Sequence, residues 1–322
     1  VSLFNKTQNM KKYFILIMFL VISSLVLGQD IKEVAAAVDK SKTGASSDSI
    51  KHWNVSGMGS LSFAQAGYSN WAAGGTNSLG LIGMINLNIN YSKGKHAWAN
   101  IVDLAYGFQF LGLGSSSQQY NKTDDKIELT STYGYEIHRN KKWYASVLAN
   151  FKSQFSKGYK YPDDSTVIST IMAPGYLVAG IGVTYVPAKW FRLYLSPTSG
   201  RFTFVLDQAL SDSGAFGVTR GKNIRGEFGV YIRADLNKDL AKNINLTSSL
   251  ELFTDYLNNF GNIDVNWNVL LTLKVNKWLA ATINANLIYD DDVNIKNSPT
   301  DPGGPRTQFK EVIGVGISYK LN

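Results

Sequence analysis

The clearest structural signal lies in residues 263–275, which read Ile-Asp-Val-Asn-Trp-Asn-Val-Leu-Leu-Thr-Leu-Lys-Val. The odd-numbered residues are all apolar, and the even-numbered residues are polar or charged except for Leu270. Successive side chains of a β-strand point to opposite faces, so this period of two predicts a strand with one apolar and one polar face. The strand is about twice the length common in soluble sheets. It is also long enough to cross a bilayer at a tilt.

The same alternation recurs along the chain from Trp53 onwards. We expect about twelve strands of this kind, as in a barrel of intermediate size. Pro197 and Gly200 indicate a bend or bulge in the seventh strand, which is the least regular. The expected strands are 53–64, 79–91, 96–110, 125–138, 142–155, 176–186, 189–206, 223–236, 242–256, 263–275, 278–290 and 308–321.

Short basic turns alternate with longer polar loops between these strands. This alternation is typical of outer-membrane barrels, whose short turns face the periplasm. The predicted fold class is therefore all-β, a single antiparallel transmembrane β-barrel of about 12 strands over residues 53–322, with both termini periplasmic. A soluble β-sandwich is the alternative, but it would have to bury or expose the second face of every long strand. The long loops are expected at 65–78, 111–124, 156–175, 207–222, 257–262 and 291–307.

The N-terminal region has the anatomy of a secretory signal. Met10-Lys11-Lys12 begins a basic segment, and an apolar run from Tyr13 to Leu27 follows before the sequence turns polar. Such a run is short for a membrane helix, so residues 1–28 are interpreted as a cleavable signal peptide with an upstream extension. Residues 29–52 are expected to form a short, flexible periplasmic leader.

Composition excludes several classes of site. The chain of 322 residues has no cysteine, which removes disulfides, thiolate metal centres and cysteine-anchored lipids. Only 17% of residues are charged, fewer than in most soluble domains. The basic residues behind the net charge of +8 are spread over turns and strands, so no nucleic-acid partner is expected. No cofactor is expected either.

Aromatic residues gather near the expected short turns. Tryptophan and tyrosine favour the bilayer interface because the ring is apolar while its N–H or O–H stays hydrated. Several such residues at equivalent strand ends predict an interfacial belt. Its members are Tyr91, Trp98, Trp143, Trp190, Trp278 and Tyr319.

The stretch Asn70-Trp71-Ala72-Ala73-Gly74-Gly75-Thr76-Asn77-Ser78 resembles part of an uncharacterised family of outer-membrane barrels from Bacteroidota. Leu195-Ser196-Pro197 and Gly214-Ala215-Phe216-Gly217-Val218 add to the resemblance, which extends over most of residues 53–322. The NWxxGGxNS pattern is its most specific part. The resemblance implies an outer-membrane location and a barrel, but no reaction.

The polar face carries charges of both signs. They can form the selectivity lining of a small pore, or they can pair across the interior and close it. Their near balance slightly favours the closed lumen. The predicted lumen-lining residues are Asp103, Glu128, Glu136, Lys152, Arg192, Arg225, Glu227, Arg233, Asp235, Glu251, Asp264, Lys274 and Lys310.

Two loops invite a functional interpretation. Trp71 with Gly74 and Gly75 can fold inward as a plug, or can form a turn with one anchored tryptophan. The acidic run that begins at Tyr289-Asp290 can bind calcium or bridge to lipopolysaccharide, although its spacing matches no EF-hand and a solvated loop is the simpler interpretation. No metal site is therefore predicted.

Catalysis is not expected. The three histidines, His52, His96 and His138, lie at the expected periplasmic strand ends, so none is available for a Ser–His or Asp–His pair at the outer rim. The leading hypothesis is a non-enzymatic channel for small solutes that inward loops narrow. The alternative is a structural or accessory subunit of a larger outer-membrane assembly, with a closed lumen. Expected partners are outer-membrane lipid, lipopolysaccharide and proteins of such an assembly.

Overall fold

The computed structural model describes residues 52–67, 76–113, 118–293, 295 and 300–321. Twelve antiparallel strands in it close into one barrel, in the ring order β1-β14-β13-β12-β11-β10-β9-β8-β5-β4-β3-β2. The predicted fold class is thus confirmed for this part of the chain. The barrel strands are β1 (Trp53–Ala66), β2 (Ser78–Lys93), β3 (His96–Leu111), β4 (Gln119–Glu136), β5 (Trp143–Ser153), β8 (Gly175–Ala188), β9 (Phe191–Phe204), β10 (Ile224–Ala241), β11 (Ile244–Asp255), β12 (Asp264–Lys274), β13 (Leu279–Tyr289) and β14 (Gln308–Leu321).

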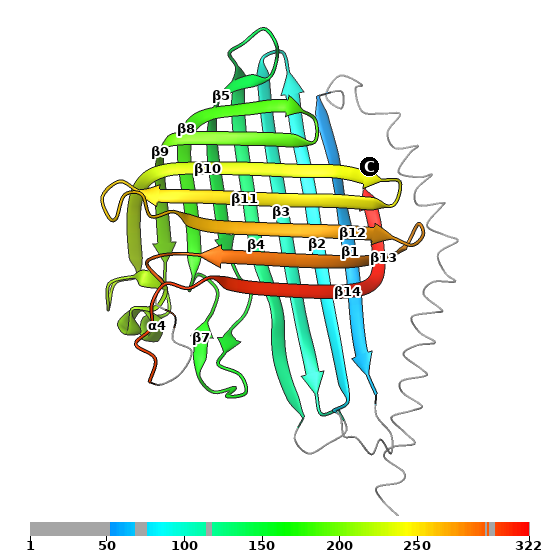
Figure 1. Ribbon diagram of the computed structural model, residues 1–322, viewed down its shortest axis with the longest axis vertical. Coiled ribbons are helices and arrows are strands. Elements are labelled where there is room, and N and C mark those ends of the chain that lie inside the picture. Colours follow the sequence, from blue (N-terminus) through cyan, green and yellow to red (C-terminus); the bar gives the residue numbers. More distant parts are fainter. Residues whose placement is uncertain (1–51, 68–75, 114–117, 294, 296–299, 322) are drawn as a thin grey trace, which may run out of the picture. The chain divides into compact units, whose positions relative to one another are not determined.

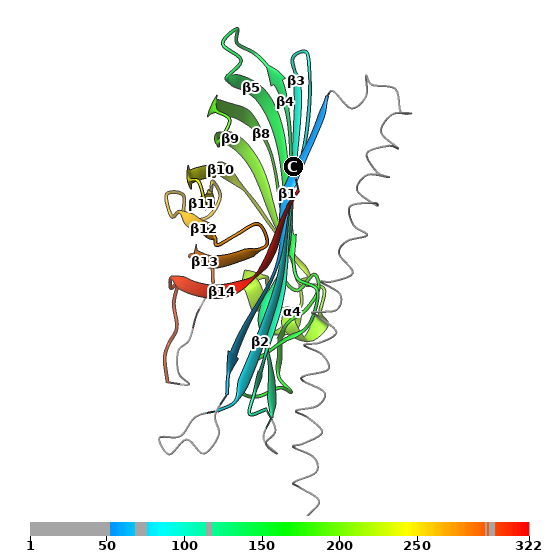
Figure 2. The ribbon, with the colours of Figure 1, turned by 90° about the vertical axis from the view of Figure 1, so that its right-hand side faces the viewer.

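The strands form two crossing walls. Strands β1 to β5 make one wall, and β10 to β14 cross it steeply on the other side of the barrel (Figures 1 and 2). Pairing of β1 with β14, from Gly57 opposite Leu321 to Phe63 opposite Val315, closes the sheet. Closure leaves no edge strand, since each of the twelve strands pairs with a neighbour on both sides.

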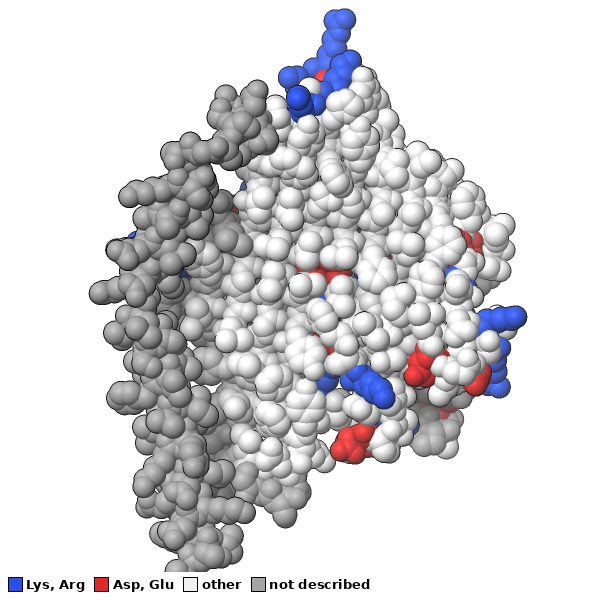
Figure 3. All heavy atoms as spheres, turned by 180° about the vertical axis from the view of Figure 1, so that it is seen from behind, with Lys and Arg blue, Asp and Glu red and all other residues white. Residues whose placement is uncertain are grey.

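Alternation determines which side chains face outward. In β12, Trp267 is exposed on the outside, whereas Thr272 is buried inside. The exposed large side chains of the barrel are mostly apolar or aromatic, as Val147, Ile181 and Ile313 illustrate. Few charged side chains show over the middle of the face seen in Figure 3, and a basic group lies at one end. This outer surface matches a hydrocarbon environment.

Most strand ends lie within about two residues of the sequence-based expectation, and two differ by five residues or more. Strand β4 begins at Gln119, although residues up to 124 were expected in a loop. In the pairing of β3 with β4, Gly107 lies opposite Asp124 and Phe108 opposite Lys122, so one residue of β4 has no partner. This extra residue interrupts the alternation in β4, which explains the wrong boundary. Strand β10 continues to Ala241, five residues beyond the expected end at 236. Asn237, Lys238 and Asp239 pair with β11, and after a register shift Ala241 pairs with Ile244, so the hairpin is longer than the apolar alternation indicates.

The bulge expected near Pro197 is confirmed. The register of β9 shifts against both neighbours, between Ile181 and Val183 of β8 and between Gly229 and Tyr231 of β10. A Cβ at Gly182 would lie 2.0 Å from the carbonyl oxygen of Leu195, so only glycine permits this close approach of β8 and β9.

The long loops carry small elements that the sequence did not predict. The β5–β8 connection contains a hairpin of β6 (Gly158–Tyr159) and β7 (Val167–Ser169). The β9–β10 connection contains α4 (Gln208–Ser213) and the 3-10 helix η2 (Ala215–Gly217). Both connections lie at the same end of the barrel (Figure 1), where Ala173, Val205, Leu210 and Val218 form a small core. Among the described residues, no helix has the length and apolar character needed to cross a membrane.

Candidate functional site: the barrel lumen

Several cavities lie along the inward face of the described barrel. One of about 210 Å³ is lined by Thr132, Tyr144 and Thr184 at the short-turn end. Four larger ones follow one another along the lumen. The turn-end cavity, about 320 Å³, is lined at the short-turn end by Asn90, Lys189 and Trp190. The side cavity, about 270 Å³, adjoins it beside Asp239 and Lys274. The central cavity, about 280 Å³, follows, and the loop-end cavity, about 240 Å³, lies nearest the long loops.

The cavities are contiguous because neighbouring ones share lining residues. Asn86 and Thr247 line the turn-end, side and central cavities alike. Asp125, Glu251 and Asn266 line both the central and the loop-end cavities. Together these four neighbouring cavities form a polar path from the short-turn end to the long-loop end.

The structure places most of the predicted lumen residues on this path. Asp103, Glu128, Lys152, Glu251 and Lys310 line the central cavity. Arg192, Arg233 and Asp235 line the turn-end cavity, Lys274 the side cavity and Asp264 the loop-end cavity. Arg225 and Glu227 lie in an ionic cluster near the long loops, and Glu136 is half-buried opposite Tyr144.

Arg233 is the centre of an ion-pair network, which we call the ionic hub. Its side chain is only 2% exposed, and its Nη1 lies 3.1 Å from Glu128 and 2.8 Å from Glu251. Its Nε donates to Asp235 at 2.9 Å. Lys152 extends the hub, with its Nζ 2.5 Å from Glu251. A guanidinium with several carboxylate partners in a desolvated site is held much more firmly than a surface ion pair.

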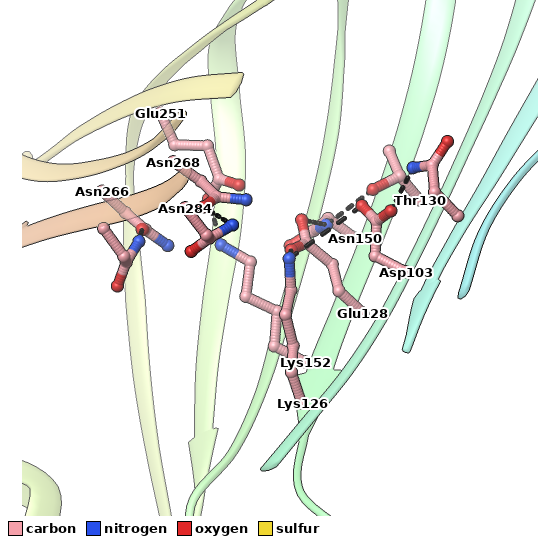
Figure 4. A network of polar contacts seen from close by, with 12 residues as sticks. Asp103, Lys126, Glu128, Thr130, Asn150, Lys152, Glu251, Asn266, Asn268 and Asn284 are labelled. Atoms are coloured by element: carbon pink, nitrogen blue, oxygen red, sulfur yellow. Dashed lines mark hydrogen bonds and ion pairs between the residues drawn. The ribbon is translucent and has the colours of Figure 1, made fainter. Parts of the chain in front are cut away.

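The hub crosses the lumen. Glu128 is on β4 and Arg233 on β10, with β5, β8 and β9 between them in the ring. Likewise, Lys152 on β5 meets Glu251 on β11, and Lys310 on β14 meets Asp124 on β4. Figure 4 shows Lys126, Glu128 and Lys152 reaching inward from one wall, and Glu251 facing them from the other. These contacts bridge opposite walls and narrow the interior.

A buried apolar cluster accompanies the hub. Leu148, Val178, Tyr194, Tyr231 and Phe253 point inward from β5, β8, β9, β10 and β11 and are nearly inaccessible to solvent. Beside it, Asn150 donates to Glu128 and to Thr130. The inner faces of β5 to β11 therefore carry a buried apolar cluster beside the ionic hub.

The opposite side of the lumen is lined by asparagines. Asn286 donates to Asn266 across β13 and β12, and Asn284 donates to Asn268 at 3.4 Å. On β2, Asn88 donates to Asn86, whose amide in turn bonds Asp103. These side chains are only partly buried, and they offer both donors and acceptors along the cavities.

A second ionic cluster lies at the long-loop end. Arg201 contacts Glu227 and Asp264, and it lies 3.9 Å from both Asp290 and Asp292. Arg225 lies 3.0 Å from Glu227 and 3.2 Å from Asp292. The pKa of Asp292 is raised chiefly by burial; Arg225 lowers it, and the carboxylates of Asp291, Glu227 and Asp290 raise it further.

Part of the acidic loop comes together with strand residues. Carboxylate oxygens of Asp264, Asp290 and Asp291 lie within 4.8 Å of one another, which is the spacing of a metal-ligand group. Asp301, in contrast, pairs with Arg306 at 2.7 Å. The loop is therefore not uniformly solvated, since Asp290 also lines the loop-end cavity.

The predicted aromatic belt residues lie near the short-turn end. Tyr91 and Trp98 are cross-strand partners, and Trp143 stacks on Tyr185 with ring centroids 4.3 Å apart. Lys238 lies over the ring of Trp190. Trp278 and Tyr319 are exposed. Sequence reasoning missed further members, Trp53, Tyr133 and Tyr185, although their alternation with polar neighbours was visible.

The predicted plug residues Trp71, Gly74 and Gly75 lie outside the described residues, as do the predicted signal peptide and nearly all of the leader. His52 and His96 lie at the short-turn end, where they bond Ser92 and Tyr133, and His138 lies in the β4–β5 turn. Sequence reasoning also missed Arg201, Lys126 and Asp124. Arg201 follows the bulge of β9, where the alternation is out of phase, and Asp124 fell in a region expected to be a loop.

Residues 63–159 match the model of a family described as a protein of unknown function (DUF3078). The match supports the predicted resemblance to an uncharacterised family, and it covers less than a third of the chain. No curated protein matches the sequence.

Several solved structures of outer-membrane barrels are similar at low identity. An outer membrane channel from Pseudomonas putida F1 is 10% identical, with a TM-score of 0.37, over 84% of this chain and 96% of that one. The NanC porin is 9% identical, with a TM-score of 0.33, over 82% and 100%. The translocator domain of the autotransporter NalP from Neisseria meningitidis is 11% identical, with a TM-score of 0.31, over 91% and 98%. Likeness at this level carries no information on solute or activity.

Proposed function

We propose that the protein is a non-enzymatic outer-membrane channel for small polar solutes. The observation that carries the proposal is the chain of contiguous cavities that links the two ends of the barrel. Asparagine side chains along it can exchange hydrogen bonds with water and with neutral polar solutes. The ionic hub occupies the other side of the lumen and limits the width.

The location in the outer membrane rests on the barrel itself. Only closed barrels and helices satisfy all backbone groups in lipid, and this barrel exposes an apolar surface with aromatic residues near its short-turn end. In the proposed orientation the short turns and both termini face the periplasm. Residues 1–28 then act as the signal peptide, residues 29–52 as a leader and residues 53–322 as the barrel. Lipopolysaccharide contacts the long-loop end.

The Bacteroidota origin and the role of the NWxxGGxNS motif remain part of this proposal. Ser78 and the residues just before it lead into β2 at the long-loop end. If Trp71, Gly74 and Gly75 fold inward, they close the same end of the path that the loop-end cavity reaches.

One observation favours a second function, that of an accessory subunit with a closed lumen. Arg233 is almost fully buried and ties β4 to β10 and β11 through the interior. Such a bridge is compatible with a barrel whose lumen is a structural core. In that case, protein partners in an outer-membrane assembly would use the outer surface or the loops.

Single-channel conductance in planar bilayers separates the two functions. The mature barrel is compared with Asn268→Trp, which fills the central cavity, and with Val269→Trp, the neighbouring residue on the lipid face. We expect steady steps in the wild type and in Val269→Trp, and smaller or absent steps in Asn268→Trp. A variant lacking residues 66–77 tests the plug.

Steps that are equal in all three full-length proteins would show that current does not follow the asparagine-lined path. The absence of conductance steps in both the wild type and the deletion variant would overturn the channel proposal and support the closed-lumen function. Steps only in the deletion variant would identify residues 66–77 as the plug.

A further inference from the structure

We infer that the loop-end cavity binds a small organic cation with an apolar body and an ammonium group. The cavity has a volume of about 240 Å³, below the ~300 Å³ at which pockets begin to hold drug-sized ligands, so the ligand is small. This cavity is also the loop-side end of the proposed conducting path, but binding there does not require solute to cross the barrel.

The walls of the cavity are mostly apolar and aromatic. Val178 and Phe253 belong to the buried apolar cluster, and Tyr176 and Tyr289 flank them. Aromatic faces attract both apolar groups and cations. The ring of Phe253 already has the guanidinium of Arg201 at 4.3 Å, which shows that a cation can be held at this wall.

Carboxylates exceed cationic groups at the loop-side end of the cavity. The cavity is lined by four carboxylates, those of Asp125, Glu251, Asp264 and Asp290, and by two cationic groups, those of Lys152 and Arg201. In the adjoining ionic cluster, Arg201 and Arg225 have four carboxylate partners. Asp291 adds a fifth carboxylate beside Asp264 and Asp290. This excess of negative charge in a partly desolvated place favours a cationic ligand.

An independent feature points to a missing ligand group. Tyr231 lines this cavity with a side chain only 1% exposed, and its buried hydroxyl lies beside Arg233 of the ionic hub without a hydrogen bond of normal geometry among the described residues. An unsatisfied buried hydroxyl costs about 1–3 kcal/mol, so a ligand that bonds it gains affinity. The cavity thus offers apolar walls, one free hydroxyl and an acidic end.

Calorimetric titration of the folded, detergent-solubilised barrel tests the inference. The probes are 2-phenylethylamine in its ammonium form, the neutral 2-phenylethanol and the anionic 3-phenylpropionate, each also titrated into empty micelles. We expect the amine to bind at least about tenfold more tightly than the alcohol, since a desolvated charge pair contributes that much or more. The anion should bind more weakly still.

Variants locate the site. Asp264→Asn and Asp290→Asn should each weaken amine binding about tenfold. Tyr231→Phe should weaken it about fivefold, because one hydrogen bond is lost without a change of shape. Asp164→Asn is the matched control, since Asp164 is an exposed carboxylate in the β6–β7 hairpin, outside the cavity. It should leave binding unchanged.

Two results would overturn the inference. Equal binding of the three probes would show a purely apolar pocket. Calcium that binds alone, with loss of binding in Asp264→Asn while the amine shows no heat, would identify a metal site in place of an organic-cation site. Neither result depends on conductance. Failure of the amine to bind therefore contradicts the cation site alone, and the absence of conductance contradicts the channel alone.

Discussion

The two sides of the lumen share one strand pattern and differ in what the inward positions carry. Under β4 to β11, the inward residues form the ionic hub and the buried apolar cluster. Under β12 to β14 and β1 to β3, they include a set of asparagines beside cavities. An antiparallel barrel can therefore combine a core-like half with a hydrated half, because every strand satisfies its backbone regardless of its inward side chains. Stability should concentrate in the first half, and solute contact in the second.

The largest expected effect is at the ionic hub. Replacing Arg233 by Met leaves Glu128, Asp235 and Glu251 without their shared cation, and breaking a buried ion pair costs about 3–5 kcal/mol. Urea titration followed by tryptophan fluorescence measures the free energy of unfolding. Arg220→Met, at an exposed loop position, should change it by less than about 0.5 kcal/mol. A loss below about 1 kcal/mol in Arg233→Met would mean that the hub is hydrated like the asparagine side.

Neighbouring residues of β5 separate the inner core from the lipid face. Leu148 is buried in the apolar cluster, whereas Val147 is half exposed to the outside. Leu148→Ala should lower the free energy of unfolding by about 3 kcal/mol, since it removes apolar contacts and leaves a cavity. Val147→Ala should cost less than about 1 kcal/mol, because lipid replaces the lost contact. The same urea titration compares them, and equal losses would contradict a core-like half.

Two asparagines offer a direct comparison of the two sides. Asn150 is buried and donates to Glu128 and Thr130, so Asn150→Ala should cost about 2 kcal/mol through unsatisfied partners. Asn284 is partly exposed and has one long bond to Asn268, so Asn284→Ala should cost less than about 0.5 kcal/mol, because water replaces the amide. If Asn284→Ala is as costly as Asn150→Ala, the asparagine side is a closed network and the conducting path loses its support.

The smallest expected effect is a change of ion preference. Asn268→Lys adds a positive charge to the central cavity, so the reversal potential in a salt gradient should shift toward anion preference. Thr219→Lys, at an exposed position of the β9–β10 loop, should leave the reversal potential close to that of the wild type. An unchanged reversal potential in Asn268→Lys would show that ions do not pass through the central cavity.

The sequence by itself determined the strands, their facing and the barrel class. Alternation such as that of residues 263–275 sets which side chains share a face, and this depends only on the local period of a strand. It also indicated the bulge at Pro197 and the inward direction of Glu128 and Arg233. It failed where the period was interrupted, at the β3–β4 register shift, and where elements are too short for any period, as in β6, β7 and α4.

Only the tertiary structure decided which inward residues meet. Glu128 and Arg233 are 105 positions apart and lie on strands that are not neighbours, so their contact depends on how the sheet closes and how far its walls are separated. The same closure brings Asp264 of β12 to Arg201 of β9 and leaves the asparagines of β2, β12 and β13 beside cavities. Local periodicity contains no information on these distances across the lumen, because strand stagger and barrel closure arise from the pairing of all twelve strands together.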